Sequence, residues 1–131
     1  MVLLDTHVWV WFVSNPDNLS DHARSSIETA MEKKAIYISS ISIWEVALLV
    51  SRNRLKLTMN VHDWIQRLEA LPFMKFIPVT NSIAIQSVYL PPPLHNDPAD
   101  RIIIATALSL GIPVVTKDEK IINYRPIETI W

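Results

Sequence analysis

Four acidic residues stand where apolar segments of the chain give way to helices or loops: Asp5, Glu45, Asp100 and Asp118. A carboxylate beside a buried segment is costly unless something compensates its charge. Neither Asp5 nor Glu45 has a basic neighbour in the sequence, so a shared compensator is expected. The simplest one is a hard divalent cation held by carboxylate oxygens, which indicates metal-dependent chemistry on phosphates.

Each of these acidic residues also has a purely structural interpretation. The segment Ser42–Glu45 matches a capping box, in which a glutamate bonds back to the amide of the capping serine. Asp97 precedes a proline and is a standard helix cap, and the helix dipole would favour Asp100 in the first turn. Asp5 could equally be a cap, and Asp118 a turn residue. Taken alone, Glu45 is better explained as a cap than as a ligand.

The elements that position these residues follow an α/β pattern. Short apolar runs alternate with longer amphipathic ones, as in a layered α/β domain. Strands are expected at about 2–4, 35–39, 75–79, 112–116 and 127–130. Helices are expected at about 6–13, 20–34, 42–54, 61–71, 81–89, 97–110 and 119–124, with Gly111 as a C-cap. Strands joined by helices predict right-handed crossovers and a mainly parallel central sheet flanked by helices, an α/β/α arrangement.

This arrangement predicts that the four carboxylates meet. Open parallel sheets bind ligands beyond the carboxyl ends of their strands. Asp5 and Asp118 directly follow predicted strands, and Glu45 and Asp100 lie in the first turns of helices that begin at the same edge. Capping does not explain why four like charges gather at one rim, because they would repel one another.

Composition predicts one soluble, cytoplasmic domain over residues 1–131. Half of the residues are hydrophobic and 19% are charged, which excludes a disordered chain. Cysteine is absent, so disulfides and thiolate metal sites are excluded, and a reducing cytosol is compatible. The apolar N-terminus has no basic region and makes a poor signal peptide. The longest apolar stretch, residues 102–115, is too short to span a membrane.

The formal net charge of -1 provides no global attraction to nucleic acid. A nucleic-acid partner would therefore depend on metal or on local basic groups. The candidate groups are Lys33 with Lys34, residues 52–56, Arg101, and Lys117 with Lys120. Lys33 and Lys34 are better explained as solvated residues, whereas the two interpretations of residues 52–56 are about even.

Histidine and tryptophan are weaker indicators of function. His7 lies two residues after Asp5 and is expected near the site. Residues 95–97 could form part of a metal site, but His95 follows three prolines and is better explained as an exposed loop residue. Neither is assigned to the metal, because oxygen ligands suit Mg²⁺ or Mn²⁺. The five tryptophans are most simply explained as core residues, although Trp9 and Trp11 could line an interface.

Four segments carry a family resemblance: LLDTHVWVW, SSISIWEVALL, HNDPADRIIIATAL and VVTKD. They resemble the acidic motifs of PIN-domain ribonucleases, and most closely those of the VapC toxins of bacterial type II toxin–antitoxin modules. The resemblance covers essentially the whole chain, and DPADRIIIATA with a downstream VVTKD is fairly specific. It implies a PIN-like fold and an acidic quartet, which here would be Asp5, Glu45, Asp100 and Asp118.

The resemblance implies an endoribonuclease that depends on one or two Mg²⁺ or Mn²⁺ ions. Asp5 and Asp100 are the first choices for direct ligands, and Glu119 is an alternative to the fourth acid. Further residues would support the site: Thr6 and Thr116 through their hydroxyls, and Asp97 as the cap beside it.

The resemblance also implies partners. These are an RNA substrate, a small VapB-like antitoxin and a second copy of the chain, with part of the interface supplied by Trp9 and Trp11. Arg101 and Lys117 are expected to contact the RNA backbone, although Arg101 could instead pair with an acidic neighbour.

Two other functions compete with this one. A phosphatase of the haloacid-dehalogenase type also has an aspartate after its first strand, but the second aspartate that it needs two residues later is His7 here. A catalytically inactive RNA-binding or scaffold protein would keep the fold alone, and a complete acidic quartet argues against it.

Overall fold

A five-stranded sheet runs through the centre of the computed structural model, which describes residues 1–131. The strands are β1 (Val2–Leu4), β2 (Ile36–Ser39), β3 (Met74–Ile77), β4 (Val114–Val115) and β5 (Thr129–Ile130). They lie in the order β3-β2-β1-β4-β5, and every neighbouring pair is parallel. The strand order therefore reverses between β1 and β4, which is where open parallel sheets form their ligand crevices.

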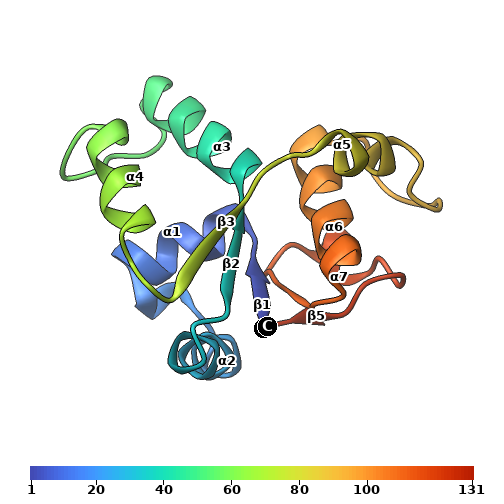
Figure 1. Cartoon of the computed structure of the whole chain (residues 1–131), viewed down its shortest axis with the longest axis horizontal. Helices are drawn as coiled ribbons and strands as arrows, with labels where there is room; N and C mark the ends of the chain where they lie inside the picture. Colours follow the sequence, from blue (N-terminus) through green and yellow to red (C-terminus); the bar gives the residue numbers. More distant parts are fainter.

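Helices cover both faces of the sheet, as Figure 1 shows. They are α1 (Thr6–Ser14), α2 (Asp21–Glu32), α3 (Ser40–Ser51), α4 (Val61–Glu69), α5 (Asn81–Val88), α6 (Pro98–Leu110) and α7 (Glu119–Ile122), with a short 3₁₀ turn, η1 (Pro16–Asn18). Helices α1, α2 and α4 lie on one side, and α5, α6 and α7 lie on the other (Figure 1). The expected α/β/α arrangement is confirmed. None of the helices has the length and apolar character that crossing a membrane requires.

The core is divided by the sheet into two parts. Along β1, Leu4 packs into the larger cluster with α1, α2 and α4, whereas its neighbour Leu3 packs with Ile103 of α6. This alternation is expected of a central strand that is covered on both faces. In the larger cluster Trp9 is fully buried, and its ring lies 5.1 Å from that of Trp64. Trp9 is therefore the core residue that the simpler interpretation predicts, and the alternative that it lines an interface is wrong.

Helix α3 begins earlier than the sequence pattern predicts. Its cap is Ser39, the last residue of β2, whose hydroxyl accepts a hydrogen bond from the Ile41 amide. Ser39 is the last paired residue of β2, opposite Ile77, and its hydroxyl can already satisfy a free amide, so α3 begins at Ser40 and not after Ser42. Glu45 consequently lies in the second turn. The capping-box interpretation of Glu45 is wrong, and so is its placement in the first turn.

Other element boundaries differ by a few residues. Strand β4 is limited to Val114–Val115, and α4 ends at Glu69 instead of residue 71. The predicted end of α6 is confirmed, because Gly111 adopts a left-handed conformation with φ of 66° and closes the helix. The strands and helices that carry the acidic residues are thus present in the predicted order.

Candidate functional site

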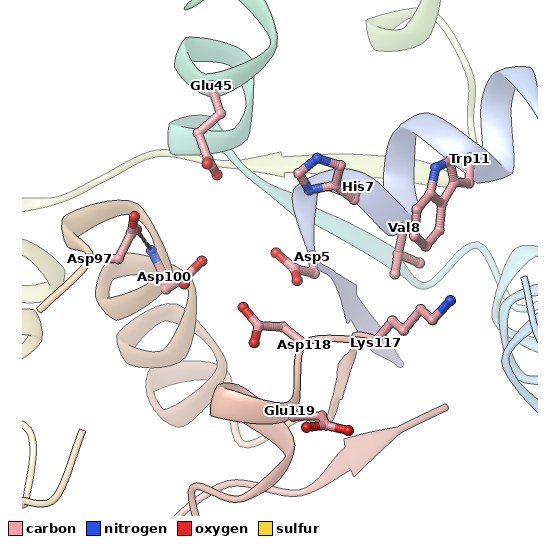
Figure 2. A pocket seen from close by; sticks show the side chains of 10 residues that line it. All are labelled: Asp5, His7, Val8, Trp11, Glu45, Asp97, Asp100, Lys117, Asp118 and Glu119. Carbon is pink, nitrogen blue, oxygen red and sulfur yellow. Dashed lines mark hydrogen bonds between the residues drawn. The ribbon is translucent and has the colours of Figure 1, made fainter. Parts of the chain in front are cut away.

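A polar pocket of about 600 Å³ opens at the carboxyl edge of the sheet, where the strand order reverses. Six of its ten lining residues are acidic, and Lys117 is the only lysine or arginine among them. The lining residues, shown in Figure 2, are Asp5, His7, Val8, Trp11, Glu45, Asp97, Asp100, Lys117, Asp118 and Glu119. The predicted gathering of carboxylates at one rim is therefore present, and His7 lies beside them as expected.

Asp5 forms the floor of the pocket. It follows β1, caps α1 and is only 8% exposed. Its Oδ1 accepts a hydrogen bond from the Thr6 amide at 2.8 Å, and its Oδ2 accepts one from the Thr116 hydroxyl at 2.7 Å. Burial raises the pKa of Asp5, and the charge of Asp118 adds to this, while the two hydrogen bonds oppose it. Both carboxylate oxygens are thus fixed in place.

Thr116 connects the two strands at the reversal point. It directly follows β4, and its hydroxyl oxygen also accepts a hydrogen bond from the Asp118 amide at 3.0 Å. Asp118 in turn caps α7 by accepting from the Lys120 amide. Asp118 lies on the side of the pocket that faces Asp5, whereas Glu119 is exposed at its edge (Figure 2). This arrangement favours Asp118 over Glu119 as the fourth acid.

Glu45 reaches the pocket from α3. Its Oε1 accepts a hydrogen bond from the Thr6 hydroxyl at 2.5 Å, and the same hydroxyl lies 2.8 Å from that of Ser42. Burial raises the pKa of Glu45 to about 7, and the charges of Asp5 and Asp100 add to the shift, while the Thr6 bond opposes it. Glu45 can therefore exchange a proton near neutral pH.

Asp100 enters from the first turn of α6, whose cap is Asp97. The Asp97 side chain accepts a hydrogen bond from the Asp100 amide at 2.9 Å, as predicted for a cap. Burial raises the pKa of Asp100 to about 6, and the charges of Asp5, Asp97 and Asp118 contribute, while a contact with His95 opposes the shift. Because these carboxylates raise one another's pKa, they form one electrostatic unit.

His95 is not the exposed loop residue that the sequence suggests. Its Nε2 lies 2.7 Å from Oδ2 of Asp100, and its side chain is only 20% exposed. The three prolines before it indicate a loop but say nothing about where that loop packs. The spacing of five residues between His95 and Asp100 was the only indication available in the sequence.

Arg101 has a structural role that the sequence did not indicate. Its guanidinium donates to the main-chain carbonyls of Ser87, Val88, Leu94 and His95. It forms no pair with an acidic side chain, so that expectation is wrong. Because its donors are engaged by the protein's own backbone, the expected contact with RNA also lacks support.

Lys117, unlike Arg101, lines the acidic pocket. Its ammonium group stands 6.0 Å from the ring centres of both Trp11 and Trp131, at the rim of the pocket. A second pocket of about 310 Å³ adjoins the first through His7 and Trp11, and Arg54 lines it. Positive charge is therefore present beside the acidic pocket, although the formal net charge of the whole chain is -1.

The acidic side chains of the pocket offer carboxylate oxygens, which are the type of ligand that a hard divalent cation prefers. The carboxylates surround the pocket without converging on one point, since no three acidic or histidine side chains are grouped closely enough to share an ion. Direct ligation by three of them would need side-chain rotation. Binding through one or two carboxylates plus water is the usual mode of Mg²⁺ and fits this spacing better.

Comparison with known sequences finds a matching family and a relative along nearly the whole chain. Residues 2–125 match the model of the PIN domain family. The chain is 38% identical over 133 residues to Ribonuclease VapC22 of Mycobacterium tuberculosis, and the match spans 99% of this chain and 98% of that protein.

Comparison with solved structures supports the fold. A toxin–antitoxin complex from Klebsiella pneumoniae contains a chain that is 21% identical, with a TM-score of 0.64 and coverage of 98% of this chain and 99% of that one. VapBC2 from Rickettsia felis, bound to a DNA fragment from its promoter, contains a chain that is 18% identical, with a TM-score of 0.70 and coverage of 98% and 97%. At these identities the likeness shows a shared fold.

Proposed function

Because the chain belongs to the PIN-domain family, we propose that it is a divalent-metal-dependent endoribonuclease and the toxin of a VapBC-type toxin–antitoxin pair. The observation that carries this proposal is the acidic pocket at the reversal point of the sheet, lined by Asp5, Glu45, Asp100 and Asp118. The 38% identity to a protein named as a ribonuclease supports RNA as the substrate. Membership of the family removes the haloacid-dehalogenase alternative.

We propose that the cation is Mg²⁺ or Mn²⁺, and that Asp5 and Asp100 are direct ligands. Glu45 and Asp118 would complete the coordination or hold a second ion. A bound divalent ion would lower the pKa of a water molecule and neutralise charge on the leaving oxygen. The Thr6 amide and the Thr116 hydroxyl would hold both oxygens of Asp5 in place during this chemistry.

The remaining catalytic work falls to residues of the chain itself. Glu45 Oε1 is bonded to Thr6, and Oε2 makes no hydrogen bond within the protein. Where Glu45 does not bind an ion, it would orient the attacking water through this free oxygen. Lys117, at the pocket rim, would contact an RNA phosphate, and the half-buried ring of Trp11 offers a face on which a base can stack.

The test of the proposal is RNA cleavage by the purified chain, freed of any co-purified antitoxin. We expect cleavage of total cellular RNA with Mn²⁺ or Mg²⁺, loss of cleavage in EDTA, and recovery when the ion is restored. Equal cleavage in EDTA would contradict metal dependence. No cleavage of any RNA with Mn²⁺ present would favour the inactive scaffold instead.

The partner proposals rest on the surface around the site. The smaller pocket, which combines Arg54 with the apolar Leu49 and Leu55, would accept part of an antitoxin tail. Proteins of the same fold are found in toxin–antitoxin complexes. Trp11 lines both pockets and would therefore lie at that contact, as the sequence suggested.

We further propose that α5 pairs two copies of the chain. Ile85, Val88 and Tyr89 project from one side of this helix and its C-cap, and they are 61%, 67% and 81% exposed. Neighbouring apolar side chains with this exposure are typical of an interface. Val88→Glu is expected to convert a dimer into a monomer at micromolar concentration, because the new charge would be buried unpaired.

Light scattering of both proteins measures this change. The matched control is Ile122→Glu, which places the same charge on an exposed apolar position of α7 and should leave the dimer intact. A wild-type chain that is monomeric, or a Val88→Glu variant with unchanged mass, would exclude this surface.

A further inference from the structure

The loop that joins α5 to α6, residues 89–97, is fixed at several points. The guanidinium of Arg101 donates to the carbonyls of Ser87 and Val88 before the loop and to those of Leu94 and His95 within it. On the other side, the Tyr124 hydroxyl donates to the carbonyl of Pro91 at 2.8 Å. The backbone of His95 is therefore held relative to α6, the helix that carries Asp100.

The hydrogen-bonding of His95 determines which ring nitrogen carries the proton. Nε2 lies 2.7 Å from Oδ2 of Asp100, whereas Nδ1 is buried and has no partner. If Nδ1 carried a hydrogen, a buried donor would be left unsatisfied, which is costly. If Nε2 carries it, Nδ1 is a bare lone pair and Nε2–H donates to the carboxylate. The geometry therefore favours the neutral Nε2–H tautomer.

This bond leaves one oxygen of Asp100 available to a ligand. Oδ2 is held by His95, whereas Oδ1 has no hydrogen-bond partner in the protein. The neighbouring charges of Asp5, Asp97 and Asp118 repel the carboxylate, so without His95 the side chain would tend to rotate away from them. Hydrogen bonds to ligating groups of this kind fix their orientation and strengthen metal binding.

We propose that His95 is a positioning residue that holds the Asp100 carboxylate with Oδ1 turned toward the pocket, ready to bind a divalent cation. The inference rests on the proposed function, in which Asp100 is a direct ligand. His95 does not serve as a ligand itself, because Nε2 is engaged by Asp100 and Nδ1 is buried. Arg101 contributes indirectly by holding the backbone of His95.

Three substitutions at His95 separate the effect of its hydrogen-bond donor from the effect of its size. His95→Gln places an amide N–H close to the position of Nε2, His95→Asn is too short to do so, and His95→Phe keeps the ring without a donor. We expect His95→Phe and His95→Asn to weaken Mn²⁺ binding by about tenfold, and His95→Gln to stay within about threefold of wild type. Electron paramagnetic resonance of free Mn²⁺, at pH 8 and without RNA, measures these affinities.

The matched control is His22→Phe on the exposed face of α2, which should not change the Mn²⁺ affinity. A second readout is cleavage as a function of Mn²⁺ concentration. Excess Mn²⁺ should restore the rate of His95→Phe, because its defect is one of affinity, but should not restore Asp100→Asn. A merely structural role for His95 would lower the rate at every concentration.

Unchanged Mn²⁺ affinity in His95→Phe, or a His95→Gln variant as weak as His95→Phe, would overturn the inference. If circular dichroism shows that His95→Phe is unfolded, the Mn²⁺ affinities of His95→Gln and His95→Asn test the inference instead. Nitrogen-15 spectra of the wild type should show the Nε2–H tautomer, and the Nδ1–H form would also overturn it. If the wild type neither binds Mn²⁺ nor cleaves RNA, the proposed function is wrong. If the wild type is active and the His95 variants bind Mn²⁺ as tightly as it does, only the role of His95 is wrong.

Discussion

Asp5→Asn is expected to lower the rate of RNA cleavage by at least about a hundredfold, the scale on which removal of a key electrostatic group acts. The substitution keeps the shape of the side chain but removes the charge that would hold the cation. The fold should survive, because the asparagine oxygen can still accept from the Thr6 amide and its amide group can donate to the Thr116 hydroxyl oxygen. A time course of RNA cleavage with saturating Mn²⁺ measures the effect.

The matched control for this experiment is Asp21→Asn, an exposed aspartate in the first turn of α2, outside the pocket. It makes the same chemical change at a helix start and should leave cleavage unchanged. Near-wild-type cleavage by folded Asp5→Asn would show that Asp5 is a helix cap and not a ligand.

Capping and a place in the acidic pocket are compatible at this site, although the sequence pattern presents capping and ligation as alternatives. Asp5, Asp97 and Asp118 each cap a helix, and each also lines the acidic pocket. The reason is topological, because helices that lead the chain back to the start of the next parallel strand begin at the carboxyl edge of the sheet. A cap that bonds its helix through one oxygen can present the other to the pocket. Helix-start motifs in this fold therefore indicate site residues as well as element boundaries.

The strands and the gathering of acids could be predicted because they depend on local patterns. Apolar runs define the strands, and the acids that follow them are carried to one rim by the parallel topology. The start of α3 could not be fixed in this way. Ser39, Ser40 and Ser42 are all chemically able to cap, and the end of pairing between β2 and its neighbours selects Ser39.

The partners of Arg101 and Trp9 could not be predicted because they depend on packing between separate parts of the chain. Arg101 bonds carbonyls up to 14 residues away, which no local pattern encodes. The ring of Trp9 packs against those of Trp64 and Phe76, so its burial requires α4 and β3 to be in place. At these positions the residue type indicated which interactions were possible, but not which residue would be the partner.

The second large effect is expected in stability, and it concerns the repulsion among the carboxylates. Burial and neighbouring charges raise the pKa of Glu45 to about 7 and that of Asp100 to about 6. Since these folded values exceed the unfolded ones of about 4, the stability that these two groups contribute is fully present below pH 4 and is lost as pH rises through 6 and 7. In EDTA the melting temperature should therefore fall between pH 5 and pH 8. Glu45→Gln should flatten this dependence, whereas Glu28→Gln on the exposed face of α2 should not.

A divalent cation should reverse this loss, because a ligand that binds only the folded state stabilises it by mass action. At a hundredfold excess over its dissociation constant, Mn²⁺ should add about 2.7 kcal/mol to the free energy of unfolding at neutral pH. Asp100→Asn removes one of the repelling charges while its side-chain oxygen can still accept from His95, so the metal-free protein should melt higher than wild type. Its increase in melting temperature with Mn²⁺ should shrink to less than half. If Mn²⁺ raises the melting temperature of both proteins equally, Asp100 does not bind the cation and acts only in the first turn of α6.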